Sequence, residues 1–207
     1  MSNTKLTIAL PKGRLMEKIQ EKFKALGYGF SFEKRKLVTT DKSGKLDIML
    51  VKNSDMPVYI NHGIAGIGIC GDDVLYESEA SFYRLLTLPF GGTKMCLAGD
   101  PEAADFTGQN HLPVATKFPK FTRDYFHNLG FSVQTIKLNG SVELAPVLGL
   151  TPYIVDLVET GSTLKAHNLK VFQELKQIQV HLIVNPAYYK INYHAIDEFV
   201  RQIEQGL

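Results

Sequence analysis

The stretch Ile154-Val155-Asp156-Leu157-Val158-Glu159-Thr160-Gly161-Ser162-Thr163 runs from an apolar segment into a turn of glycine and hydroxyl residues. The apolar part has the length and composition of a buried strand, and the hydroxyl residues favour the first turn of a helix. A buried strand that leads directly into a helix is the repeating unit of α/β proteins. The same succession recurs along the chain, which predicts an α/β fold with mostly parallel sheets and helices on both faces.

The spacing of apolar residues, glycines and prolines predicts the individual elements. Strands are expected at 5–10, 46–51, 65–70, 82–86, 93–98, 114–116, 133–138, 153–158 and 175–184. Helices are expected at 15–26, from Pro57, from Val74, and at 119–129, 140–148, 160–167 and 192–205. Ligands of open α/β sheets bind at the carboxyl ends of the strands, so each turn from a strand to a helix is a candidate site.

Composition and charge exclude several classes of protein. The 207 residues are 44% hydrophobic and 21% charged, and the net charge of +2 argues against a large nucleic-acid footprint. No apolar run approaches the roughly 18 residues of a membrane span, and the N-terminal segment lacks the pattern of a secretion signal. The two cysteines are expected to be buried and reduced, and the six histidines show no metal-ligand spacing. We therefore expect a cytoplasmic protein that does not bind membranes.

The turn at 160–163 has the properties of a phosphate-binding site. A helix N-terminus presents unpaired N–H groups and a partial positive charge, and Gly161 would let the backbone approach a phosphate closely. The hydroxyl groups that could donate to phosphate oxygens belong to Thr160, Ser162 and Thr163. Asp156 and Glu159 would hold ribose hydroxyls or Mg²⁺, which prefers oxygen ligands. An ordinary capped helix after a buried strand is the alternative interpretation of the same residues.

Other predicted turns carry charged residues. Lys12-Gly13-Arg14 places two cations around a glycine at a strand end, which suits a polyphosphate, although a solvated helix start is the alternative. Arg35 stands in Glu33-Lys34-Arg35-Lys36, which looks like a charged surface strand. Asp72 and Asp73 precede the helix expected from Val74, where one of them could contact a nucleotide or simply cap the helix. Glu143 lies in the first turn of the helix expected at 140–148, where an acid could contact a ligand or simply favour the helix dipole.

Six segments in order resemble the catalytic subunits of ATP phosphoribosyltransferase. They are Ile8-Ala9-Leu10-Pro11-Lys12-Gly13-Arg14-Leu15, Asp55-Met56-Pro57-Val58-Tyr59, Gly68-Ile69-Cys70-Gly71-Asp72-Asp73-Val74-Leu75, Ala115-Thr116-Lys117-Phe118-Pro119, Gly140-Ser141-Val142-Glu143-Leu144-Ala145-Pro146 and Val155-Asp156-Leu157-Val158-Glu159-Thr160-Gly161-Ser162-Thr163-Leu164. The resemblance covers nearly the whole chain. Two positions depart from the patterns: Asp72 stands where this family often has Lys or Arg, and Val155 replaces one of the two adjacent acids of the common phosphoribosyltransferase fold.

The resemblance implies a fold with two lobes, similar to type II periplasmic binding proteins, with the active site in the cleft. The first lobe would comprise residues 1–91 and 170–207, and the second would comprise residues 92–169 and carry the phosphoribosyl pyrophosphate loop. The implied phosphoribosyl pyrophosphate-binding residues are Glu143, Asp156, Glu159, Thr160, Gly161, Ser162 and Thr163. The implied ATP-binding residues are Lys12, Gly13, Arg14 and Asp73. Arg14 and Arg35 would be catalytic residues, near the ATP triphosphate and the departing pyrophosphate.

The resemblance also implies a pentosyltransferase reaction, a type of glycosyl transfer. The 5-phosphoribosyl group of phosphoribosyl pyrophosphate would be transferred to N1 of ATP in the first step of histidine biosynthesis. Mg²⁺ would be bound through substrate phosphates, with Glu143 or Asp156 as its nearest protein ligands. The length resembles the short form of the family, which implies a regulatory subunit similar to histidyl-tRNA synthetase and a hetero-octamer. Two other hypotheses are a solute-binding protein of the same fold and a phosphoribosyltransferase that acts on a different base.

Overall fold

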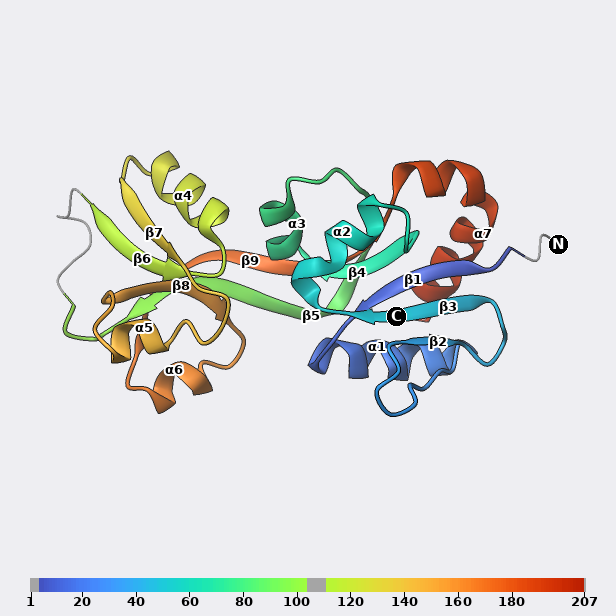
Figure 1. Ribbon diagram of the computed structural model, residues 1–207, viewed down its shortest axis with the longest axis horizontal. Helices are drawn as coiled ribbons and strands as arrows, with labels where there is room; N and C mark the ends of the chain where they lie inside the picture. Colours follow the sequence, from blue (N-terminus) through green and yellow to red (C-terminus); the bar gives the residue numbers. More distant parts are fainter. Residues whose placement is uncertain (1–3, 104–110, 207) are drawn as a thin grey trace. The chain divides into compact units, whose positions relative to one another are not determined.

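The computed structural model describes residues 4–103 and 111–206, which form two compact units (Figure 1). Unit 1 comprises residues 1–91 and 179–207, and unit 2 comprises residues 92–178. The chain therefore leaves the first unit once and returns to it. The return is at residue 179 rather than at the expected 170, because one strand, Lys170–Val184, passes through the division without a break in its sequence pattern.

The elements of unit 1 follow the predicted alternation of strands and helices. They are β1 (Leu6–Pro11), α1 (Arg14–Ala25), β2 (Val38–Thr40), β3 (Leu46–Val51), the 3-10 helix η1 (Asn53–Asp55), α2 (Met56–Asn61), β4 (Ile67–Gly71), α3 (Asp72–Ser78) and α7 (Pro186–Gln205), with parts of β5 (Tyr83–Gly99) and β9 (Lys170–Val184). The strand order is β2-β3-β1-β4-β9. β3 and β4 are parallel to β1, whereas β2 and β9 pair antiparallel with their neighbours.

Alternating side chains along the central strands of unit 1 build a core on each face of the sheet. Ile8 and Leu10 of β1 belong to a cluster that includes Ile19 of α1 and Phe199 of α7. Ala9, between them in sequence, belongs to a second cluster with residues of α2 and α3. Helices therefore cover both faces, as the period-two pattern of buried strands requires.

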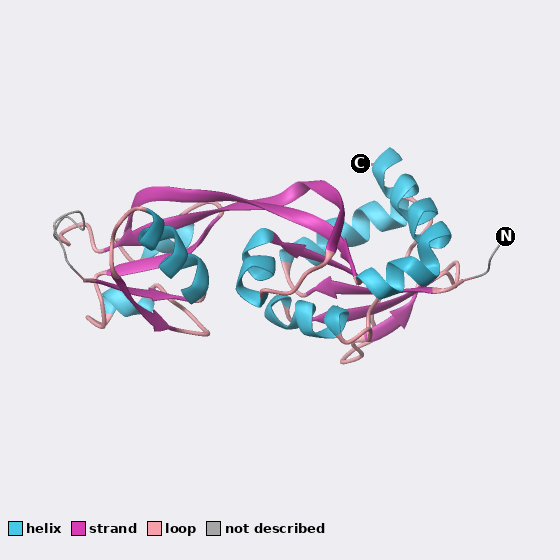
Figure 2. Ribbon diagram, turned by 90° about the horizontal axis from the view of Figure 1, so that it is seen from above, coloured by secondary structure: helices cyan, strands magenta, loops and turns pink. Residues whose placement is uncertain are grey.

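Unit 2 repeats this layering on a smaller scale. Its elements are β6 (Leu112–Thr116), α4 (Pro119–Asn128), β7 (Val133–Lys137), α5 (Leu144–Val147), β8 (Tyr153–Val158) and α6 (Ser162–Ala166), with the remaining parts of β5 and β9. The strand order is β5-β8-β6-β7, with β6 parallel to both neighbours and β5 antiparallel to β8. α4 packs on one face through Phe121 and Phe126, and α5 and α6 pack on the other through Ala145 and Leu164. Figure 2 shows helices beside the strands in each unit.

Several predicted boundaries were wrong. The two strands expected at 82–86 and 93–98 form the single strand β5, because Gly91 takes a φ of 78° that glycine tolerates and the strand continues past it. The helix expected at 140–148 forms only from Leu144 to Val147. α7 begins with a segment that was not predicted, from Pro186, which Asn185 caps by accepting hydrogen bonds from Ala187 N and Tyr188 N; after a kink at Asn192 it follows the helix expected at 192–205.

The two cysteines are buried in the core. Cys70 and Cys96 are both buried free thiols, as expected. Burial raises the pKa of Cys70 to about 12, with Asp73 as a further cause, so this thiol is not activated as a nucleophile.

In the described part of the chain, every helix is too short or too polar to cross a bilayer. The α/β class is confirmed, although the antiparallel pairs of β2, β5 and β9 make the sheet mixed.

Candidate active site

The carboxyl ends of the parallel strands in unit 2 gather the candidate residues of its second half. Thr116, the last residue of β6, is paired with Val155 of β8 and with Lys137 of β7. The three strands therefore end at one edge of the sheet. The residues that follow these ends are Lys117 after β6, Glu143 before α5, and the segment 156–163 at the end of β8. A parallel sheet thus brings together residues that are far apart in the sequence.

The turn at 160–163 joins β8 to α6 in a conformation that depends on glycine. Gly161 is the N-cap residue of α6 and has a φ of 74°, which side chains with a Cβ rarely adopt. Thr160 Oγ1 lies 3.0 Å from Ser162 Oγ, so the two hydroxyls are directed toward each other. Thr160, Ser162 and Thr163 are exposed. The turn presents its hydroxyls to the solvent at this edge, and Ser162 N at the helix start donates to Thr160 Oγ1 at 3.4 Å.

Asp156 is an acid of this edge whose pKa is raised above its ordinary value. Burial raises its pKa, the nearby Lys117 lowers it, and the charge of Glu143 raises it again, so that the net shift is upward. Its side chain is 19% exposed, Lys117 Nζ lies 3.8 Å from Oδ2, and Leu157 N donates to Oδ1 at 2.9 Å. A carboxylate that is shielded from water and repelled by a second acid favours a nearby cation.

The parallel strands of unit 1 form a second such edge. β1 pairs with β3 up to Pro11 and Val51, and Lys12 N donates to Val51 O at 3.0 Å. Gly13 follows with a φ of 105° and is the N-cap of α1, whose first residue is Arg14. Lys12, Gly13 and Arg14 are exposed. The cations predicted to bind a polyphosphate therefore follow the carboxyl end of β1.

Arg35 lies near the same edge, which its charged surroundings in the sequence did not indicate. Leu50 N near the end of β3 donates to Leu37 O at 2.8 Å, and β2 then runs antiparallel to β3. Arg35 precedes Leu37 by two residues and has a φ of 68°, a left-handed conformation that is uncommon for a residue with a side chain. The short strand β2, which the sequence did not predict, brings this arginine to the edge.

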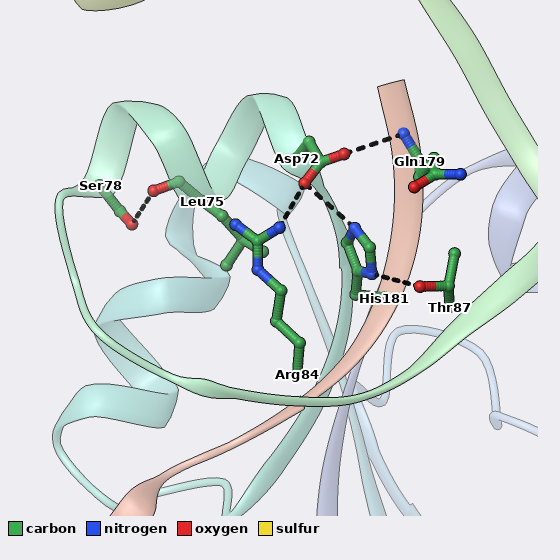
Figure 3. Close-up of polar contacts among 7 residues, drawn as sticks. All are labelled: Asp72, Leu75, Ser78, Arg84, Thr87, Gln179 and His181. Carbon is green, nitrogen blue, oxygen red and sulfur yellow. Dashed lines mark hydrogen bonds and ion pairs between the residues drawn. The ribbon is translucent and has the colours of Figure 1, made fainter. Parts of the chain in front are cut away.

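Two buried acids follow β4 at the edge of unit 1. Asp72 and Asp73 form the start of α3, and their exposed fractions are 9% and 5%. Asp72 accepts hydrogen bonds from Arg84 and His181, as Figure 3 shows. The carboxylate at position 72 is thus engaged with cationic and polar partners of its own unit.

Sequence reasoning missed the partners of the candidate acids. Lys117 pairs with Asp156, and Arg84 and His181 contact Asp72. None of these pairs follows a local pattern, because each depends on which strands are neighbours. Among residues 4–103 and 111–206, no group of three or more His, Cys, Asp or Glu side chains could hold a metal ion.

Comparison with known proteins gives the family. A family model described as HisG: ATP phosphoribosyltransferase matches residues 52–205. The chain is 41% identical over 202 residues to an ATP phosphoribosyltransferase of Clostridioides difficile, and the match covers 97% of each chain. The chain belongs to the ATP phosphoribosyltransferase family.

Further members of the ATP phosphoribosyltransferase family support this assignment. An enzyme of that name from Caldicellulosiruptor saccharolyticus is 46% identical over 191 residues, which cover 90% of this chain and 91% of the relative. The solved ATP phosphoribosyl transferase (HisG:HisZ) complex from Thermotoga maritima contains a chain of 37% identity with a TM-score of 0.84, and the match covers 97% of this chain and 98% of that one.

The fold extends beyond the ATP phosphoribosyltransferase family. The alkanesulfonate-binding protein SsuA from Xanthomonas axonopodis matches 98% of this chain and 73% of its own with a TM-score of 0.67. Its sequence identity is 11%, so the likeness concerns the fold alone. The expected similarity to type II binding proteins is confirmed at that level.

Proposed function

We infer that the chain is the catalytic subunit of an ATP phosphoribosyltransferase. It transfers the 5-phosphoribosyl group of phosphoribosyl pyrophosphate to N1 of ATP, which gives N1-(5-phosphoribosyl)-ATP and pyrophosphate, the first step of histidine biosynthesis. Family membership supports the reaction. The observation that carries the proposal for the site is the exposed turn at 160–163, a glycine-dependent helix start beside the buried acid Asp156.

Phosphoribosyl pyrophosphate would bind at the edge of unit 2. The N–H groups of the turn and the hydroxyls of Thr160, Ser162 and Thr163 would hold the 5′-phosphate, because a helix start stabilises an anion without requiring a lysine. Asp156, Glu159 and Glu143 would contact the ribose hydroxyls and the metal-bound pyrophosphate. Lys117 would limit the repulsion between these acids and the anionic substrate.

ATP would bind at the edge of unit 1. Lys12, the backbone of Gly13 and Arg14 would hold the triphosphate, and arginine suits this role because its planar group can donate two parallel hydrogen bonds to a phosphate. Asp73 would accept a hydrogen bond from the adenine. Arg35, whose segment lies beside the end of β3, would contact the triphosphate or the departing pyrophosphate.

Magnesium fits the residues of unit 2 when it is bound largely through substrate. Mg²⁺ commonly uses one or two carboxylates together with phosphates and water, so a protein site with three ligands is not required. Asp156 and Glu143 are close enough for the charge of Glu143 to raise the pKa of Asp156, and a cation would relieve that repulsion. The ion would supply positive charge to the pyrophosphate as it leaves.

The protein's own contribution would be orientation and charge stabilisation. Adenine N1 attacks the anomeric carbon of the ribose, the bond to pyrophosphate breaks, and pyrophosphate leaves with the bonding electron pair. Adenine N1 has a lone pair at neutral pH, so no strong general base is needed. Arg14 and Arg35 would stabilise the charge on the leaving pyrophosphate, and the turn would hold the ribose in place through its phosphate.

A regulatory partner belongs to the same proposal. The related Thermotoga chain is part of a HisG:HisZ complex, and this chain matches its relatives over nearly their full length. We therefore propose the short form of the enzyme, which binds a regulatory subunit similar to histidyl-tRNA synthetase in a hetero-octamer. Because both substrates are metabolites made inside cells, the proposal includes a cytoplasmic location.

Formation of the product tests the proposal. The purified chain is incubated with ATP, phosphoribosyl pyrophosphate and Mg²⁺, with and without the regulatory subunit, and the nucleotide product is identified by mass. We expect a product with one phosphoribosyl group added to ATP and an equal amount of pyrophosphate. Adenine, guanine and uracil replace ATP in parallel reactions. Product from one of these bases but none from ATP would contradict the proposal.

A further inference from the structure

Asp72 is a buried acid that joins three elements of unit 1. Its Oδ1 accepts from Arg84 Nη1 at 2.8 Å and from His181 Nε2 at 3.0 Å, and its Oδ2 accepts from Gln179 N at 3.2 Å (Figure 3). Arg84 belongs to β5, and Gln179 and His181 belong to β9. The carboxylate therefore ties the start of α3 to two neighbouring strands.

The partners of Asp72 are themselves held in place. His181 Nδ1 lies 3.1 Å from Thr87 Oγ1, so both ring nitrogens of this histidine have a partner. A carboxylate only accepts hydrogen bonds, so Nε2 carries the proton that faces Asp72. The side chains of Asp72 and His181 are 11% and 6% exposed, and the two carboxylate oxygens are already engaged. Asp72 is therefore not available to contact a ligand directly.

The position of Asp72 suggests what its contacts accomplish. α3 starts immediately after β4, and its N-cap is Gly71, which offers no capping side chain. β9 runs beside β4, with Gly71 paired to Val180, so the partners from β9 lie next to the start of the helix. The contacts of Asp72 with β5 and β9 anchor the first turn of α3 to these strands, and Asp73 is the next residue of that turn.

We propose that Asp72, held by Arg84 and His181, is a positioning residue that fixes the first turn of α3 and thereby the Asp73 carboxylate that recognises the adenine of ATP. The inference rests on the proposed function, because it deepens the assignment of Asp73. It separates two neighbouring acids by role: Asp73 contacts the nucleotide, and Asp72 contacts only the protein. A loss of the network moves Asp73 and weakens ATP binding, while the phosphoribosyl pyrophosphate residues of unit 2 stay unchanged.

Steady-state kinetics of Asp72→Asn, in complex with the regulatory subunit, tests the proposal. Asparagine has nearly the same size but lacks the charge that holds Arg84, and its NH2 group must face either Gln179 N or the donors Arg84 and His181. We expect the KM for ATP to rise about fivefold or more, as the loss of a charge-assisted hydrogen bond allows. The KM for phosphoribosyl pyrophosphate should stay within about twofold, since its proposed residues belong to the other compact unit.

Asp41→Asn is the matched control. Asp41 is another buried acid of unit 1, 4% exposed, and it accepts from Ser43 N and Leu46 N at the amino end of β3, away from the proposed ATP residues. Its replacement should lower the melting temperature without changing either KM. An Asp72→Asn enzyme that also loses only thermal stability, with both KM values unchanged, would overturn the positioning role.

A second pair of variants keeps the test open should Asp72→Asn fail to fold. His181→Gln retains a donor toward Asp72 and an acceptor toward Thr87, whereas His181→Leu retains neither. We expect the leucine variant to show the raised KM for ATP and the glutamine variant to recover most of the loss. Equal KM values for the two variants would overturn the proposal. A wild-type complex that makes no product from ATP would instead contradict the proposed function.

Discussion

At the scale of single residues, the two proposed substrate sites differ in their electrostatics. Arg14 and Lys12 are exposed cations, whereas Asp156 is a largely buried acid whose pKa is raised by burial. Groups with such perturbed pKa values are often kept for function at the expense of stability. Substitutions at the two edges should therefore affect activity and stability in different ways.

Replacement of Arg14 by Ala should lower turnover with little change in stability. Loss of its contacts to the transition state is expected to reduce kcat by at least about tenfold, which corresponds to about 1.4 kcal/mol. The measurement is the initial rate at saturating ATP and phosphoribosyl pyrophosphate. Lys22→Ala, in the last turn of the same helix, is the control and should keep full activity. An unchanged rate for Arg14→Ala would remove this residue from the mechanism.

Replacement of Asp156 by Asn should reduce activity and raise stability. The folded-state pKa of this acid lies above its ordinary value, so near neutral pH the ionised carboxylate destabilises the folded state relative to the unfolded one. The amide removes that penalty, and the free energy of unfolding should increase. As the pH falls through the raised pKa, the acid is protonated first in the folded state and, below 3.8, in the unfolded state as well, so the difference in stability between the two proteins should shrink over this range. Urea unfolding of both proteins at several pH values measures this difference in the free energy of unfolding. A variant less stable than the wild type at pH 7 would contradict this account.

Candidate residues beside a strand end could be found in the sequence because their signal is local. Thr160, Gly161 and Arg14 each follow a predicted strand directly, and the structure keeps them at helix starts. Lys117 and Arg84 could not be paired with Asp156 and Asp72 in the same way. Their contacts depend on strand order and register, which a local pattern does not encode.

At the scale of elements, the boundaries that failed are those set by tertiary contacts. Pro89, Gly91 and Gly92 predict a break, yet β5 continues through them because neighbouring strands supply its hydrogen bonds. Conversely, the 140–148 segment has a helical pattern but forms only a short helix around Pro146. The long apolar strands β3 and β8 matched their predicted limits because length and composition alone identify a buried strand.

The packing of α7 against the start of β4 should depend on Gly66. A Cβ at this position would lie 2.1 Å from the ring of Tyr188 in α7, whose hydroxyl accepts a hydrogen bond from Thr7 N at 3.0 Å. Gly66→Ala should therefore displace the ring and lower the free energy of unfolding by about 2 kcal/mol. Gly29→Ala is the control, since its Cβ would meet Lys42 at an ordinary 3.7 Å. Equal urea midpoints for the two variants would show that α7 is not held in this way.

At the scale of the whole molecule, two compact units each carry a set of parallel strand ends with charged or hydroxyl residues. The α/β class and the return of the chain to the first unit could be anticipated from the alternation of elements and from the resemblance. The position of the return could not be anticipated, because β9 continues without interruption on both sides of residue 179.

The proposed regulatory subunit gives a prediction for the assembly. Mixing the chain with its partner similar to histidyl-tRNA synthetase should give a complex whose mass, measured by light scattering, corresponds to four copies of each chain. Activity should rise with complex formation, because binding that favours the active conformation increases turnover. Two separate peaks at micromolar concentrations, together with unchanged activity, would contradict the short-form assignment.

The proposed active site depends most on the helix start at 160–163, which would bind the 5′-phosphate of phosphoribosyl pyrophosphate. A crystal structure of the chain with phosphoribosyl pyrophosphate and Mg²⁺ tests it directly. We expect the 5′-phosphate within about 3 Å of the backbone N–H groups of this turn, with Asp156 beside the ribose. Clear ligand density at another place, with the turn empty, would contradict it.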